Sequence, residues 1–102
     1  MTPEAKVKKS VKDLLKKYGA YYAMPIGAAY GSSGTPDFLV CHRGVFIAIE
    51  CKAGSAKVTP LQDKALREIG KAGGTSLVIN EKNIEQVEYL LTEISDRRDE
   101  DP

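Results

Sequence analysis

The 102-residue sequence contains no tryptophan, one histidine, two cysteines and no long run of apolar residues. A membrane-spanning helix needs about 18 or more successive apolar residues, so we expect no transmembrane segment. The lysine-rich N-terminus is unlike a signal peptide, which favours a cytoplasmic protein that is not secreted. Two cysteines exclude a disulfide-rich scaffold, and without clustered histidines they exclude a structural zinc site. Neither GxxxxGK(S/T) nor GxGxxG occurs, so we expect no nucleotide cofactor.

Charge is distributed unevenly along a chain whose formal net charge is only +1. Residues 1–80 carry 12 Lys/Arg against 6 Asp/Glu, a balance of +6, whereas residues 81–102 carry 3 against 8, a balance of −5. A basic body suits a polyanion partner such as nucleic acid. Lysines on a solvated helix face explain the same charge equally well, so composition leaves both interpretations open.

Hydrophobic periodicity and turn residues predict a single α/β domain with the element order αβββαβα. The expected strands are 20–26, 37–42, 45–51 and 75–79, and residues 27–35 are expected to form a loop. A first helix should begin at Thr2-Pro3 and end at Gly19. A second should run from Thr59-Pro60 to Gly73, and Ile84 to Ile94 should line a third. We expect one domain over residues 1–95 and a disordered acidic tail over 96–102.

Residues 37–42 and 45–51 flank Arg43-Gly44 and are typical of a β-hairpin with a two-residue turn. Counting outward from this turn places Asp37 opposite Glu50, with Lys52 on the same face as Glu50. Facing carboxylates repel each other, and a hard divalent cation such as Mg²⁺ would remove the repulsion. A surface salt-bridge cluster of these three side chains is the alternative, which the residues alone leave open.

The other reactive or aromatic residues give weaker signals. His42, at the end of the hairpin, is expected at the surface. Cys41 and Cys51 would lie on opposite faces of the hairpin, so we expect no disulfide between them. Of the adjacent Tyr21 and Tyr22, one should pack in the core, and the other could stack on bases or line a dimer contact.

Two groups of residues resemble a known family. Pro36-Asp37 followed by Glu50-Cys51-Lys52 is similar to the PD-(D/E)XK pattern of metal-dependent nucleases. The stretch Gly34-Thr35-Pro36-Asp37, the close hairpin and Thr59-Pro60-Leu61-Gln62 resemble more narrowly the virus-type replication-repair nuclease domain, VRR-NUC. The resemblance runs from Glu4 to about Ile79. It implies a compact domain with a central mixed sheet and a restriction-endonuclease-like core.

The resemblance also implies roles for individual residues. The metal ligands would be Asp37, Glu50 and the backbone carbonyl of Cys51. Lys52 would be the catalytic lysine. Gln62 would orient Lys52 or a phosphate, although capping of the second helix explains this glutamine equally well. Glu4 would complete the site directly or through water, with an ordinary N-terminal helix acid as the alternative.

These roles imply a Mg²⁺- or Mn²⁺-dependent endonuclease that cuts branched DNA, such as Holliday junctions or flaps, in viral or bacterial replication and repair. The length suits the stand-alone members of the family, and we expect a homodimer because a four-way junction needs two symmetric cuts. DNA contacts are expected from Lys8, Lys12, Lys16, Ser32 and Ser33. The alternatives are a nuclease-like module that binds DNA without cutting it and a small interaction protein.

Overall fold

Helix α1 (Pro3–Lys17) begins and ends where the sequence predicts. The computed structural model describes residues 1–26 and 34–100, with side chains as far as Arg97. The Thr2 hydroxyl accepts a hydrogen bond of 3.1 Å from the Ala5 amide, which satisfies one of the free amides of the first turn. Beyond the helix, Gly19 has a φ of 70°, a left-handed conformation that glycine adopts without steric cost.

Four strands form one mixed sheet in the order β1-β2-β3-β4. The first two pairs are antiparallel and the β3–β4 pair is parallel. The strands are β1 (Tyr21–Ala23), β2 (Phe38–His42), β3 (Val45–Cys51) and β4 (Thr75–Ile79). Three of them match the predicted ranges to within one residue. β1 is shorter than the predicted 20–26, because its ladder with β2 extends over only three residue pairs.

The turn between β2 and β3 fixes the register of the hairpin. Arg43 (φ 50°) and Gly44 (φ 86°) both have positive φ, which is typical of two-residue turns whose twist matches that of the strands. All five residue pairs of the ladder have the predicted register. One position further out, Asp37 lies opposite Glu50, so the turn chemistry alone brings the two carboxylates together.

Helix α2 (Pro60–Lys71) begins with the predicted capping box, and helix α3 (Glu85–Glu100) ends the described part of the chain. The expectation of a disordered tail from residue 96 is wrong as far as residue 100. Arginine and glutamate are good helix formers, and Glu93 forms an i,i+4 ion pair of 3.9 Å with Arg97. A helix already docked through its first half therefore continues without apolar residues. Residues 101–102 lie outside the described residues.

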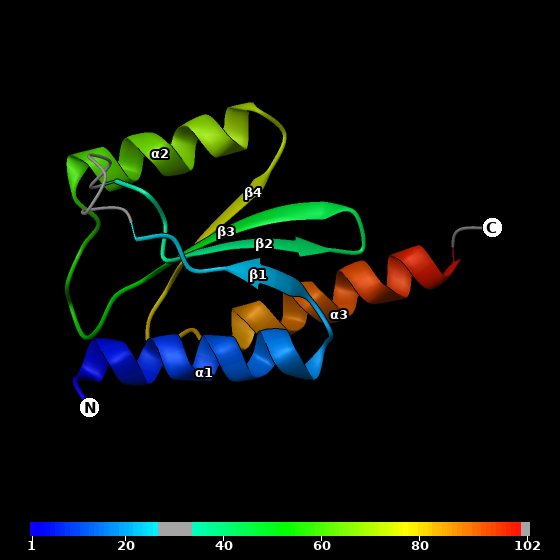
Figure 1. Ribbon diagram of the computed structural model, residues 1–102, viewed down its shortest axis with the longest axis horizontal. Helices are drawn as coiled ribbons and strands as arrows, with labels where there is room; N and C mark the ends of the chain where they lie inside the picture. The colour runs from blue at the N-terminus through cyan, green and yellow to red at the C-terminus, as the bar shows by residue number, and fades with distance from the viewer. Residues whose placement is uncertain (27–33, 101–102) are drawn as a thin grey trace.

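Helices cover both faces of the sheet (Figure 1). α1 and α3 lie on one face, and α2 lies on the other. The buried core fills the space between the sheet and the α1–α3 layer; its members are Val7, Val11, Leu15, Phe38, Val40, Ile47, Ile49, Cys51, Ile79, Val87, Leu91 and Ile94. Because side chains alternate along a strand, Ala48 and Glu50 face the opposite side, toward α2.

His42 is buried, contrary to the expectation of a surface position. Its exposed fraction is 3%, and its Nε2 lies 2.8 Å from Ser95 Oγ and 3.2 Å from the Leu91 carbonyl oxygen. Both partners belong to α3, which packs against this end of the hairpin and covers the imidazole. The two cysteines are free, with Cys41 exposed and Cys51 buried, in agreement with their predicted positions on opposite faces.

The adjacent tyrosines of β1 also divide as predicted. Tyr22 packs edge-on against Phe38, with ring centroids 5.9 Å apart. Tyr21 is 73% exposed and remains available to a base or a second protein. No helix in the described ranges is long and apolar enough to cross a membrane.

Candidate active site

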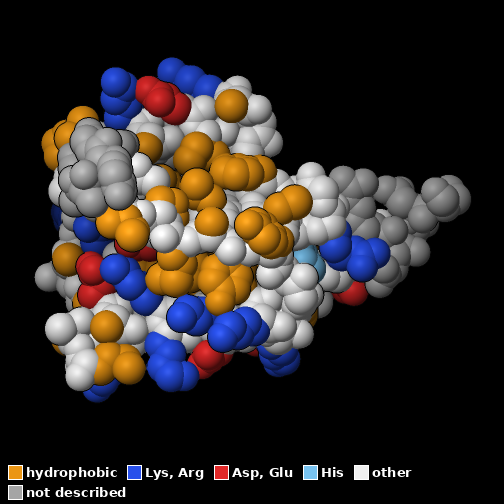
Figure 2. Space-filling model, in the orientation of Figure 1, with side chains coloured by type: hydrophobic (Ala, Val, Ile, Leu, Met, Phe, Trp, Pro, Cys, Tyr) orange, Lys and Arg blue, Asp and Glu red, His pale blue; other side chains and the backbone are white. Residues whose placement is uncertain are grey.

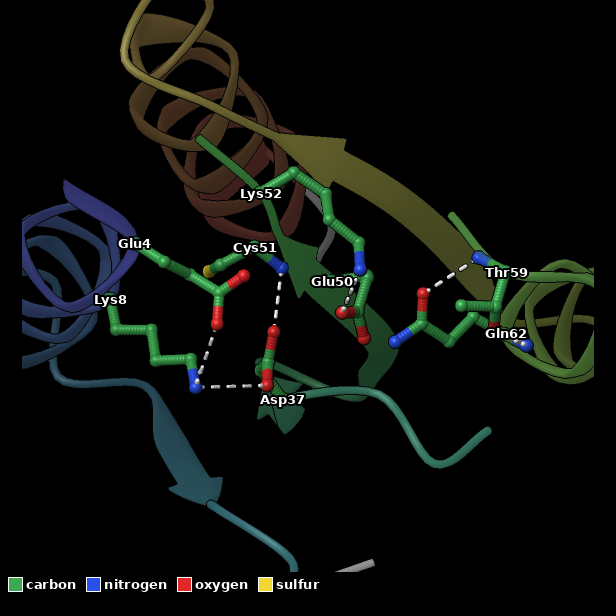
Figure 3. A network of polar contacts seen from close by, with 8 residues as sticks. All are labelled: Glu4, Lys8, Asp37, Glu50, Cys51, Lys52, Thr59 and Gln62. Carbon is green, nitrogen blue, oxygen red and sulfur yellow. Dashed lines mark hydrogen bonds and ion pairs between the residues drawn. The ribbon is translucent and has the colours of Figure 1, made fainter. Parts of the chain in front are cut away.

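The residues of the PD-(D/E)XK pattern meet at the end of the sheet where β3 finishes (Figure 3). Asp37 stands at the start of β2, and Glu50 and Lys52 stand on either side of the last residue of β3. Figure 3 places this group between α1 and α2, with side chains from the first turns of both helices directed toward it. The site therefore combines the open end of a β-hairpin with two helix starts.

The segment before Asp37 approaches α2 so closely that only glycine fits at residue 34. A Cβ atom on Gly34 would collide with the backbone carbonyl of Leu61 in the first turn of α2. Pro36, two residues later, is buried and has a fixed φ. The Gly-Thr-Pro-Asp stretch thus has a structural reason, because its glycine packs against the start of α2 and fixes the segment that leads into Asp37.

Asp37 uses both of its carboxylate oxygens. Oδ2 accepts a hydrogen bond of 2.8 Å from the backbone N–H of Cys51, and Oδ1 lies 3.4 Å from Lys8 Nζ. In an extended strand the N–H and C=O of one residue point to the same side of the strand. The carbonyl of Cys51 therefore also faces Asp37, which is the direction that a carbonyl ligand beside this carboxylate requires.

Glu50 is the most perturbed carboxyl group of the site. Its side chain is 4% exposed, its Oε2 lies 3.7 Å from Lys52 Nζ, and its Oε1 is buried with no hydrogen-bond partner among the described residues. Burial, followed by the charge of the neighbouring Asp37, raises the pKa of Glu50 from 4.5 to about 7. A buried oxygen without a partner costs free energy, so this oxygen favours a proton or a cation.

The thiol of Cys51 takes no part in the chemistry of the site. Its side chain belongs to the core, and burial raises the thiol pKa to about 12, with further contributions from the charges of Asp37 and Glu50. The nucleophilic form of cysteine is the thiolate, which such a pKa suppresses at neutral pH. The Cys51 thiol is therefore not a candidate nucleophile.

Helix α1 adds two charged side chains. Lys8 Nζ lies 3.5 Å from Glu4 Oε2 and 3.4 Å from Asp37 Oδ1, so Lys8 bridges the helix and the start of β2. Burial lowers the pKa of Lys8, but the charges and hydrogen bonds of Asp37 and Glu4 outweigh this effect and raise the pKa above 10.5. Glu4 thus reaches the site through Lys8, and its charge also contributes to the raised pKa of Glu50.

Gln62 caps α2 and also faces the site. Its side-chain Oε1 accepts a hydrogen bond of 2.9 Å from the backbone N–H of Thr59, and the backbone N–H of Gln62 donates to Thr59 Oγ1 at 3.2 Å. The side-chain nitrogen of Gln62 points toward Glu50 (Figure 3). The capping and site roles are therefore compatible, because they use the two different ends of one side-chain amide.

A groove along α1 carries the other lysines that the sequence singled out. Figure 2 shows Lys and Arg side chains gathered over this helix. The residues lining the groove include Lys8, Lys9, Lys12, Asp13, Lys16 and Met24. Lys8 belongs to both the groove and the carboxylate cluster, so the basic groove extends to the site. Ser32 and Ser33 lie outside the described residues.

The donor set of the site fits a hard divalent cation. Within residues 1–26 and 34–100, no three His, Cys, Asp or Glu side chains gather closely enough to hold an ion. The chain would therefore offer two carboxylates, from Asp37 and Glu50, and the Cys51 carbonyl. Mg²⁺ needs few protein ligands because it retains several waters. A cation would also give the unpartnered Glu50 Oε1 a partner.

Comparison with known proteins agrees with this geometry. No protein-family model and no curated protein matches the sequence. A solved structure of a VRR-NUC domain matches with a TM-score of 0.71 and 27% sequence identity, covering 90% of this chain and 97% of the other. The chain is a VRR-NUC domain. Its helices and mixed sheet have the PD-(D/E)XK-like fold, and it is a nuclease-type domain.

Sequence reasoning about this VRR-NUC domain missed one member of the site. The i,i+4 spacing of Glu4 and Lys8 indicates an ion pair between them. No local pattern indicates the contact between Lys8 and Asp37, which are far apart in the sequence and meet only because α1 packs beside the end of the sheet. Lys8, expected to contact DNA, lies against the carboxylates.

Proposed function

We propose that this VRR-NUC domain is an endodeoxyribonuclease that depends on Mg²⁺ or Mn²⁺ and hydrolyses phosphodiester bonds in branched DNA. The observation that carries the proposal is the Glu50 carboxylate, which is buried beside Asp37 with its Oε1 unpartnered among the described residues. Paired carboxylates repel phosphate, so they are of no use to a protein that only binds DNA. They suit a cation that contacts the phosphate itself.

Asp37, Glu50 and the carbonyl of Cys51 would hold the metal ion. When bound, Mg²⁺ or Mn²⁺ supplies Lewis-acid stabilisation of the negative charge that develops on the phosphate. Asp37 is held in place for this role by the N–H of Cys51. Glu50 keeps its proton up to about pH 7 when no cation is present, so protons compete with the ion for this carboxylate.

Lys52 would assist the attacking water. Its side chain is 12% exposed and its Nζ lies 3.7 Å from Glu50 Oε2, so packing and charge both hold the ammonium at the site. An ammonium in this position orients a water and neutralises charge that builds on the phosphate. The Gln62 side-chain nitrogen, directed to the same region, can donate a hydrogen bond to a phosphate oxygen.

The groove along α1 is the proposed path of the DNA backbone. Lysines line it, and it extends to the carboxylates through Lys8. Lysine–phosphate contacts give DNA affinity that is independent of sequence and falls with salt. The starts of α1 and α2 beside the site add the positive ends of two helix dipoles, which favour a phosphate there.

The proposed substrate is branched DNA, and the proposed assembly is a homodimer. A domain of 102 residues covers little more than the surroundings of one scissile phosphate. Resolution of a four-way junction requires two cuts related by twofold symmetry, which an isologous dimer provides. The exposed Tyr21 on edge strand β1 can contribute to a base contact or to the dimer.

The decisive experiment is cleavage of labelled single-stranded, duplex, flap and four-way DNA in Mg²⁺, in Mn²⁺ and in EDTA. We expect cleavage of the flap or four-way substrate with either metal and none in EDTA. Asp37→Asn should abolish cleavage while the circular-dichroism spectrum stays that of the wild type. Glu93→Gln, an exposed change on α3, is the matched control and should cut normally.

The same experiment separates the alternatives. A domain that only binds DNA would shift these substrates in a gel with or without metal and would cut none of them. A protein-interaction domain would ignore DNA altogether. Full cleavage by the Asp37→Asn variant would overturn the assignment of the site, even if the wild type is a nuclease.

A further inference from the structure

Both carboxylate oxygens of Asp37 have partners within the chain. Oδ2 accepts the backbone N–H of Cys51 at 2.8 Å, a bond between two parts of the rigid sheet. Oδ1 faces Lys8 Nζ at 3.4 Å, and the same ammonium lies 3.5 Å from Glu4 Oε2. The contact with Oδ1 is the replaceable one, because a lysine side chain is long and flexible whereas the Cys51 amide is fixed.

Lys8 differs in this respect from Lys12, another lysine of the groove. Lys12 lies one turn further along α1 and lines the same groove. Lys12 has no ion pair with a carboxylate in the described part of the chain, whereas Lys8 bridges two carboxylates from different elements. The side chain of Lys8 is 33% exposed and that of Asp37 is 21% exposed, so solvent screens their attraction only in part.

We propose that the Lys8 ammonium engages the Asp37 oxygen, Oδ1, that a divalent cation held by Asp37, Glu50 and the Cys51 carbonyl would use, so that the cation must displace Lys8 from Asp37 in order to bind. The inference rests on the proposed function, because it concerns the same metal site. Oδ1 is the Asp37 oxygen that is not already engaged by the backbone. A monovalent ammonium and a divalent cation next to this oxygen would repel each other. The displaced side chain can then turn outward along the groove, toward a phosphate.

The test is a calorimetric titration of Mn²⁺ into the full chain without DNA, so that metal affinity is measured independently of cleavage. Lys8→Met keeps the length of the side chain and removes its charge, and Lys12→Met is the matched control. We expect Lys8→Met to bind Mn²⁺ about fivefold more tightly than the wild type, the factor that partly exposed ion pairs typically contribute. The affinity of Lys12→Met should stay within about twofold of the wild type, because its charge is more remote from Asp37.

Each outcome decides a different point. Unchanged or weaker Mn²⁺ binding by Lys8→Met overturns the inference, and it does so whether or not the domain is a nuclease. Absence of Mn²⁺ binding by the wild type and by Lys8→Met overturns the proposed metal site as well. An equal gain in Lys12→Met would assign the effect to general charge and also overturn the inference. Should Lys8→Met fail to fold, Lys8→Gln replaces it with the same expected gain.

Discussion

Replacing Glu50 with glutamine should change how the stability of the metal-free protein depends on pH. The folded protein holds the Glu50 proton up to a pKa of about 7, whereas the unfolded chain releases it near 4.5. Between these pH values the unfolded chain binds fewer protons, so the free energy of unfolding falls as pH rises. The stabilising contribution is complete below pH 4.5 and is lost above pH 7.

The size of this effect follows from the two pKa values. The pKa of Glu50 is 4.5 in the unfolded chain and about 7 in the folded protein. This difference lowers the free energy of unfolding by about 3 kcal/mol as the pH rises through that interval. In a domain of this size each kcal/mol shifts the melting temperature by about 4–8 °C, so the loss corresponds to more than about 10 °C. Glutamine cannot ionise, and the Glu50→Gln protein should lack this loss.

The assay is thermal unfolding in EDTA from pH 4 to pH 8.5, analysed as the difference between wild type and Glu50→Gln so that all other titrations cancel. Glu68→Gln, on the exposed face of α2, is the control and should give a flat difference. At pH 8, Mg²⁺ should raise the melting temperature of the wild type but not of Glu50→Gln, because binding compensates the buried charge. A pH-independent difference between wild type and Glu50→Gln would refute the assignment of a raised pKa to Glu50.

Three further variants separate chemistry, binding and capping. Lys52→Ala should lower the cleavage rate at least about 100-fold with little change in DNA affinity measured by fluorescence anisotropy, because the ammonium acts in the transition state. The double variant Lys12→Ala/Lys16→Ala should bind DNA more weakly and lower the slope of log affinity against log salt by about 2; an unchanged slope would place the groove away from DNA. Gln62→Glu should melt within about 5 °C of the wild type because glutamate preserves the cap, yet cleave at least about tenfold more slowly because an oxygen replaces the amide nitrogen facing Glu50. Wild-type cleavage by Gln62→Glu would leave capping as the only role of this residue.

The sequence by itself determined the features that depend on neighbouring residues. Arg43-Gly44 takes the positive φ values of a two-residue turn, and this turn sets the register that brings Asp37 opposite Glu50. Thr59 and Gln62 have the spacing of a capping box, and both of its hydrogen bonds are present. Turn conformation and helix capping are short-range effects, so a few consecutive residues were enough to predict them.

Tertiary packing decided the features that depend on how elements meet. His42 ends a hairpin and was expected at the surface, but α3 covers it and supplies Ser95 as a partner. Lys8 lies on a helix face rich in lysine, yet the placement of α1 beside the sheet directs it to Asp37. Neither contact has a local signal, because each joins residues that are far apart in the chain.

The raised pKa of Glu50 depends on both the local sequence and the tertiary packing. The sequence places a second carboxylate opposite Glu50, but the largest cause of the raised pKa is burial, with Asp37 second. Burial arises when the hairpin and its neighbouring helices exclude water from this end of the sheet, so it exists only in the folded domain. The sequence therefore determined which groups face each other, and the tertiary structure decided how strongly they are perturbed.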